Sequence, residues 1–189
     1  MEDVLCDGIF SKIGIENRCC FEAGAANGIF LSNTRMFYNQ GWKTILVECD
    51  EDKYQKLVVN SKRAKCFNEV IQSSGLDGIL QRADAPKDID LLSLDIDGQE
   101  YYVWKNTKVY RPRIVVIEWS PYVKTDFIPK LDSYGNKGYN QAGLCSMLRL
   151  ANEKDYVVVA VICTNLICVR SELVPSRKQW WDGEFPIAS

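Results

Sequence analysis

Hydrophobic residues in this chain gather in short uninterrupted runs that are separated by longer, mixed segments. The clearest runs are Cys19–Phe21, Thr44–Val47, Leu91–Leu94 and Ile114–Ile117. Uninterrupted apolar runs of this length are typical of strands that are buried on both faces, as in parallel sheets. The mixed segments between them are long enough for helices, so the pattern predicts strands alternating with helices.

The remaining elements are predicted from spacing and from capping residues. Helices are expected at 1–15, 29–40, 52–61, 76–81 and 141–152, with a further strand near 64–67. Asp50, Ser74 and Asn140 are placed to cap three of these helices. Two last apolar runs, 156–163 and 166–170, are joined through Thr164–Asn165 and predict a closing antiparallel hairpin. The fold class predicted is therefore α/β, with a mostly parallel sheet.

Composition indicates an ordinary globular domain. The 189 residues are 47% hydrophobic and 25% charged, so we expect a single domain over 1–189. The net charge of -2 gives no sign of a nucleic-acid partner. No apolar run approaches the ~20 residues of a membrane helix, and the first residues lack the features of a signal peptide. We expect a cytoplasmic protein with neither a membrane nor a nucleic acid as partner.

The eight cysteines show no C-x-x-C spacing, and the chain has no histidine. Zinc sites are normally built from such cysteine pairs or from histidine, so none is predicted. We interpret the cysteines as reduced thiols that pack in the core of a cytosolic protein. The lack of histidine also excludes every mechanism in which histidine activates a serine or cysteine.

Small residues crowd the turn after the first strand. An acid, Glu22, is followed by Gly24, Ala25, Ala26 and Gly28. Residues without bulky side chains let the backbone turn sharply and let a ligand approach the main chain. The acid two residues before the first glycine would repel the pyrophosphate of a dinucleotide, but it suits a ligand with positive charge. S-adenosylmethionine, with its sulfonium and α-amino groups, is such a ligand.

Glu48 ends the second strand, roughly 20 residues after the glycine turn. A nucleotide-binding βαβ unit places a carboxylate at this distance, where it accepts hydrogen bonds from ribose hydroxyls. Strand, glycine turn, helix, strand and acid together predict a site for a nucleoside-containing ligand.

Three further acids follow neighbouring strands. Asp95 and Asp97 follow the run that ends at Leu94, and Glu118 ends the next strand. The carboxyl ends of parallel strands face one crevice, so we expect these acids beside Glu48. They could act as a general base, position polar groups of a substrate or bind magnesium, which prefers oxygen ligands. Asp97 also fits a capping pair with Glu100 at the start of the next helix.

Aromatic residues mark two other segments. Segment 121–138 carries Tyr122, Phe127 and Tyr134, with Tyr139 just beyond it, and is predicted to be either a substrate lid or a surface insertion. Trp180 and Trp181 could cover a core or a partner surface.

Taken together, several segments resemble the FkbM-like branch of the class I S-adenosylmethionine-dependent methyltransferases. The matching segments are FEAGAANG, SNT, GWKTILVE, LLSLDIDGQEYYVW, YRPRIVVIEWSP and NQAG. The resemblance implies a Rossmann-like seven-stranded sheet closed by an antiparallel hairpin. It also implies that Glu22, Gly24, Ala26 and Gly28 line the methionine and ribose part of the cofactor. In the same way, Glu48 would hold the ribose hydroxyls and Asp95 would lie beside the methyl-transfer crevice.

The function this implies is transfer of the sulfonium methyl group to the hydroxyl of a small molecule or glycan, assisted by Asp95, Asp97 or Glu118. Two alternatives stay open. The chain could be a non-catalytic module that keeps the fold as a binding or assembly surface, since Ala26 stands where the motif has glycine. A nicotinamide-dependent oxidoreductase is the other alternative, and Glu22 disfavours it.

Overall fold

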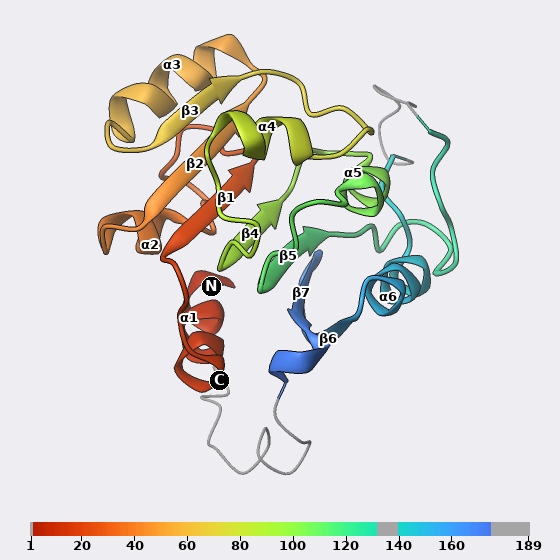
Figure 1. The fold of residues 1–189 in the computed structure, drawn as a ribbon. Helices are drawn as coiled ribbons and strands as arrows, with labels where there is room; N and C mark the ends of the chain where they lie inside the picture. Colours follow the sequence, from red (N-terminus) through yellow and green to blue (C-terminus); the bar gives the residue numbers. More distant parts are fainter. Residues whose placement is uncertain (1, 132–139, 175–189) are drawn as a thin grey trace.

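Seven strands form a single mixed sheet, described here by a computed structural model covering residues 2–131 and 140–174 (Figure 1). The strands are β1 Cys19–Ala23, β2 Lys43–Glu48, β3 Lys65–Asn68, β4 Leu91–Leu94, β5 Ile114–Glu118, β6 Tyr156–Ile162 and β7 Asn165–Arg170. Their order is β3-β2-β1-β4-β5-β7-β6, with β1 to β5 parallel and β7 antiparallel to both β5 and β6. The predicted fold class is confirmed.

Six α-helices cover the two faces of this sheet (Figure 1). They are α1 Glu2–Ile13, α2 Arg35–Asn39, α3 Glu51–Asn60, α4 Asp77–Arg82, α5 Glu100–Asn106 and α6 Leu144–Glu153, and a short 3₁₀ helix follows at Ser171–Leu173. One core cluster joins α4, α5 and α6 to the sheet. Clusters that include residues of α1, α2 and α3 form on the other side.

Successive side chains of β1 point alternately to the two faces of the sheet. Phe21 packs with the α4, α5 and α6 cluster, whereas Cys20 packs with the α1 and α2 cluster. Successive side chains of a strand point to opposite faces, so Glu22 is directed to the same side as Cys20. The strand thereby places a carboxylate beneath the segment that leads into α2.

The helix predicted at 29–40 is much shorter than expected. Only Arg35–Asn39 is helical, and the preceding residues Ile29, Phe30 and Leu31 are exposed by 52%, 71% and 82%. Leu31 has a φ of 56°, which a helix cannot contain. The helix predicted over 29–34 is wrong, because hydrogen bonds to Asn27 and Glu22 fix this segment in a non-helical path.

Other predicted boundaries differ by smaller amounts. Asp50 caps α3 as predicted, accepting a hydrogen bond from the Lys53 backbone N–H at 2.9 Å. Ser74 and Asn140 do not cap helices, since α4 and α6 begin after Leu76 and Gly143. The helix predicted at 141–152 therefore begins three residues later than expected.

Part of the aromatic segment at 121–138, together with Tyr139, Trp180 and Trp181, lies outside the described residues. Within the described part of the chain, no helix has the length and apolarity that crossing a membrane requires.

Candidate functional site

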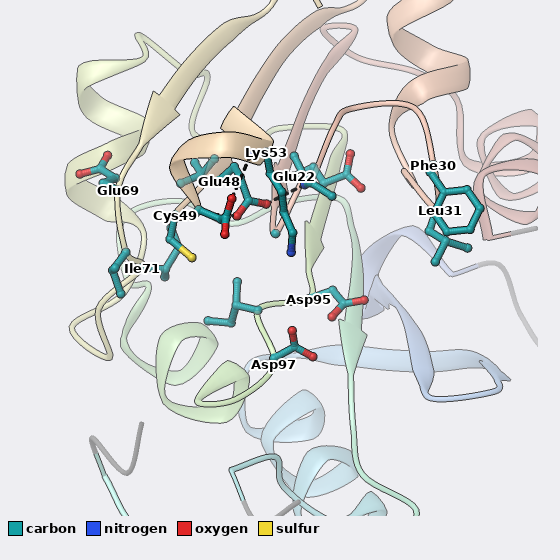
Figure 2. Close-up of a pocket in the computed structure, with 17 residues that line it drawn as sticks. Glu22, Phe30, Leu31, Glu48, Cys49, Lys53, Glu69, Ile71, Asp95 and Asp97 are labelled. Atoms are coloured by element: carbon teal, nitrogen blue, oxygen red, sulfur yellow. Dashed lines mark hydrogen bonds between the residues drawn. The ribbon is translucent and has the colours of Figure 1, made fainter. Parts of the chain in front are cut away.

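A cavity of about 560 Å³ opens at the carboxyl ends of β1, β2 and β4 (Figure 2). Its described lining residues are Glu22, Gly24, Ala25, Ala26, Phe30, Leu31, Val47, Glu48, Cys49, Asp50, Lys53, Glu69, Val70, Ile71, Asp95, Ile96 and Asp97. The structure thus brings together residues from the glycine turn, the end of β2 and the loop after β4. Parallel α/β sheets bind ligands at this edge.

The glycine turn lies against the loop after β4. Gly24 has a φ of 76°, and a Cβ built on it would lie 1.7 Å from the backbone oxygen of Asp95. Both Gly24 and Ala25 donate their backbone N–H to the Val47 oxygen at 3.0 Å. Only glycine can occupy this position without displacing the neighbouring backbone, so Gly24 permits the close approach of the turn and the loop after β4.

Glu48 is held at the cavity wall by two backbone groups. Its Oε2 accepts the Ala26 N–H at 2.8 Å, and its Oε1 accepts the Asp50 N–H at 2.9 Å. The side chain is 5% exposed, yet each carboxylate oxygen has further lone pairs. Ala26 has a φ of 46°, which directs its N–H toward the carboxylate. Glu48 is therefore a hydrogen-bond acceptor held in a fixed position.

Glu22 reaches the cavity but is occupied by the chain itself. Its oxygens accept hydrogen bonds from the Ser32 hydroxyl at 2.6 Å, the Asn33 N–H at 2.9 Å and the Thr34 hydroxyl at 2.5 Å. Asn33 also donates its side-chain amide to the Ser93 hydroxyl at 3.0 Å. Burial raises the pKa of Glu22 above its ordinary value, and these three donors offset only part of the rise. The carboxylate holds the loop before α2, a role the sequence analysis did not assign.

Gly28 is not among the residues that line the cavity. A Cβ at this position would lie 2.6 Å from Leu57 Cδ1 and 2.7 Å from Ser61 Oγ. The geometry therefore does not support the predicted contact of Gly28 with a cofactor. Glycine is required here because α3 packs closely against the turn.

Asp95, Asp97 and Glu118 form a compact cluster, as their positions after neighbouring strands predicted. One carboxylate oxygen from each lies within 4.8 Å of the others. Asp95 and Asp97 line the cavity, whereas Glu118 is not among its lining residues and accepts a hydrogen bond from the Gln141 amide. Gln141 belongs to the segment NQAG and was predicted as a helix residue, and its contact with Glu118 was not predicted.

The carboxyl groups of Asp95 and Glu118 lie close enough in this cluster for each to affect the other's proton affinity. Burial, and then the charge of Asp95, raises the pKa of Glu118 to about 9. Burial also raises the pKa of Asp95 above its ordinary value. Two buried carboxyl groups this close do not both ionise readily, so this pair favours a bound proton.

The predicted capping pair of Asp97 and Glu100 is wrong. Glu100 instead accepts the N–H groups of Ile96 at 3.1 Å and Gly98 at 2.8 Å with its Oε1. No side chain caps α5, because Gln99 occupies the N-cap position in a left-handed conformation. Asp97 is thus an exposed carboxylate free of a capping role. Burial raises the pKa of Glu100 to about 7.

Several lining residues were missed by the sequence analysis. Phe30 and Leu31 were assigned to a helix, and Lys53 was only a helix residue, although its side chain extends into the cavity (Figure 2). Cys49 was expected in the core, but it is exposed and lines the cavity, and Cys145 and Cys163 are exposed as well. The exposure of Cys49 could not be predicted from the run VECD, because it depends on β2 ending at Glu48, one residue earlier.

Comparison with known proteins gives agreement at the level of the fold. No protein-family model matches the chain, and no curated protein matches it in sequence. Solved structures do match: a TehB-like SAM-dependent methyltransferase from Corynebacterium glutamicum superimposes with a TM-score of 0.54 at 11% identity, covering 89% of this chain and 84% of that one. The fold is that of the class I methyltransferases.

Two further neighbours were crystallised with S-adenosylhomocysteine (SAH), the demethylated form of the cofactor. Magnesium protoporphyrin IX methyltransferase from Synechocystis PCC 6803 has a TM-score of 0.56 at 10% identity, with 90% of this chain and 82% of that one covered. An O-methyltransferase from Bacillus cereus has a TM-score of 0.56 at 16% identity, with 89% and 80% covered. None of these neighbours tests the FkbM-like resemblance, which stays a prediction.

Proposed function

We propose that this protein is an S-adenosylmethionine-dependent methyltransferase of the FkbM-like branch that methylates a hydroxyl oxygen of a small molecule or glycan. The observation that carries the proposal is the Glu48 carboxylate, fixed on the cavity wall by the N–H groups of Ala26 and Asp50. A carboxylate in this position can accept both hydroxyl protons of a ribose. The fold of the neighbours supports the same cofactor.

The residues of the cavity fit this cofactor on two counts. Gly24 lets the turn lie directly against the loop after β4, and the cavity of about 560 Å³ joins this turn to Glu48. Apolar side chains of Val47, Ile71 and Ile96 line the same cavity and can contact an adenine ring. We propose Gly24, Ala25 and Ala26 as contacts of the methionine and ribose part.

When bound, S-adenosylmethionine supplies a methyl group on a positively charged sulfur. The protein supplies position and proton handling. In the proposed reaction the acceptor oxygen forms a bond to the methyl carbon, and the bond from carbon to sulfur breaks with its electron pair remaining on sulfur. The hydroxyl proton would pass to the carboxylate of Asp95, which lines the cavity beside Glu118. Asp97 lies at the outer side of the same crevice.

Magnesium on Asp95, Asp97 and Glu118 is the competing role for these carboxylates. We propose proton handling instead, because burial raises the pKa of both Asp95 and Glu118 and so favours a protonated carboxyl group where an ion would need charged ligands. Activity that persists in EDTA supports proton handling. Activity that EDTA abolishes and magnesium alone restores would reassign the cluster to a metal.

The test of the cofactor site is calorimetric titration of the protein with S-adenosylmethionine, SAH and NAD. We expect binding of the two adenosyl-sulfur ligands and about tenfold or greater weakening in Glu48→Gln, which loses charge-assisted hydrogen bonds. Glu51→Gln is the matched control, since Glu51 is exposed and bonds only Gln55 at 2.6 Å. A folded protein that binds neither sulfur ligand would favour the non-catalytic binding module, and binding of NAD alone would favour an oxidoreductase.

A further inference from the structure

Three apolar side chains at the cavity entrance are held in solvent by the chain around them. They belong to Ile29, Phe30 and Leu31, of which Phe30 and Leu31 line the cavity. The Asn27 side chain accepts the N–H groups of Ile29 and Phe30, each at 3.0 Å, and Glu22 fixes the three residues that follow. These bonds prevent the segment from folding its apolar side chains into the core.

The opposite side of the entrance carries an excess of negative charge. Figure 2 shows Asp95 and Asp97 below Phe30 and Leu31, on the loop that follows β4. Among the described residues, no lysine or arginine forms an ion pair with Asp95, Asp97 or Glu118. Lys53 extends from α3, on the side of the cavity that carries Glu48.

Glu100 adds a buried carboxyl group directly beneath this loop. It is 1% exposed, and its Oε1 accepts the N–H groups of Ile96 and Gly98, on either side of Asp97. Its Oε2 has no hydrogen-bond partner among the described residues. The loop therefore lies over a carboxyl group that holds its backbone in place through one oxygen and leaves the other without a partner in the described part of the protein.

We propose that the methyl acceptor is an amphipathic molecule that carries a protonated amine, bound between the apolar side chains of Phe30 and Leu31 and the carboxylate of Asp97. This inference rests on the proposed methyltransferase function and specifies its substrate class. The apolar body of the acceptor covers the exposed side chains, and its ammonium group meets the exposed carboxylate. The sulfonium of the cofactor accounts for the charge near Asp95, whereas Asp97, further out, is left for the acceptor. Phosphate- or carboxylate-bearing acceptors would be repelled.

The test uses three probes that share a phenol body and differ in charge: tyramine, 4-ethylphenol and 3-(4-hydroxyphenyl)propionate. Their binding is measured by calorimetry on the full chain in EDTA, with and without saturating SAH. We expect tyramine to bind about tenfold more tightly than 4-ethylphenol, and the propionate to bind most weakly. Equal binding of the three probes, or preference for the propionate, would overturn the proposal.

Variants separate the charge from the apolar contact. Asp97→Asn should remove the preference for tyramine, and Phe30→Ala should weaken all three probes by a similar factor. Val59→Ala, on the exposed face of α3, is the matched control and should change nothing. A tyramine preference that survives in Asp97→Asn would refute the assigned contact.

SAH binding and the order of probe affinities separate failure of the proposed function from failure of this inference. Loss of SAH binding rejects the cofactor site, but the charge order of the probes can still be measured without cofactor. Intact SAH binding with no charge order rejects the acceptor class alone. Titration with magnesium alone tests whether the carboxylates bind a metal ion. Tight binding of the ion with loss of tyramine binding would assign the carboxylates to a metal and overturn the proposal.

Discussion

Replacing Gly24 with alanine tests the close approach on which the cavity depends. The new Cβ would lie 1.7 Å from the Asp95 oxygen and 2.9 Å from the Asp95 carbonyl carbon, both of them backbone atoms. Neither can move without separating the glycine turn from the loop after β4. The residue also has a φ of 76°, a conformation that costs alanine ~1–2 kcal/mol.

Two other glycines separate these contributions. Gly14 has a φ of 74° but no atom within 4 Å of its built Cβ, so Gly14→Ala carries the conformational cost alone, ~1–2 kcal/mol. Gly8 lies inside α1 with equally open space, and Gly8→Ala should stabilise the protein by ~0.5–1 kcal/mol. Gly24→Ala adds the overlap with the backbone, and its total cost should be ~3–5 kcal/mol.

The assay is urea denaturation of the three variants and the parent protein, followed by fluorescence, with SAH affinity measured on each folded sample. For a chain of this length, the loss in Gly24→Ala corresponds to a fall in Tm of roughly 10 °C. SAH affinity should fall in Gly24→Ala and stay unchanged in the other two variants. A Gly24→Ala protein as stable as Gly14→Ala would refute the close approach, and with it the geometry of the cavity.

Three further predictions concern stability. Asp90 is fully buried, accepts the backbone N–H groups of residues 16, 17 and 18 at 2.7–3.0 Å and lies 3.6 Å from Arg113. Asp90→Asn should therefore lower the free energy of unfolding, measured by urea denaturation, by ~3 kcal/mol, and a loss below ~1 kcal/mol would contradict this. Phe37 is 0% exposed, so Phe37→Ala should lower the free energy of unfolding by ~3–5 kcal/mol. Phe30 is exposed, so Phe30→Ala should leave that free energy within ~0.5 kcal/mol of the parent protein. Similar losses in the two variants would place Phe30 in the core. Glu118 has its pKa raised from 4.5 to about 9, so the folded state binds its proton more tightly and stability from this group is lost as pH rises between those values. Glu118→Gln should therefore gain stability relative to the parent at pH 8 and lose that advantage near pH 4, and thermal scans at the two pH values would show an unchanged difference if the reasoning were incorrect.

The strands were predictable because burial on both faces leaves a signal that local residues carry by themselves. The uninterrupted runs at 44–47, 91–94 and 114–117 each became a strand, and the acids after them became neighbours because parallel strands end at one edge. Asp50 was likewise identified as a cap, since capping depends on a residue and the three that follow it. The hairpin at 156–170 followed from the same local pattern.

Only the tertiary structure decided what Glu22, Asp97 and Phe30 do. Glu22 is bound by residues ten to twelve positions further on, a contact that replaces the predicted helix with a fixed loop and leaves Phe30 exposed. Asp97 lost its capping role because Glu100 bonds to the backbone on either side of it. Local sequence propensity does not predict such contacts, because their free energy comes from groups that come together only when the chain has folded. The sequence by itself determined the sheet and the edge where the site lies, and tertiary contacts determined which side chains face a ligand there.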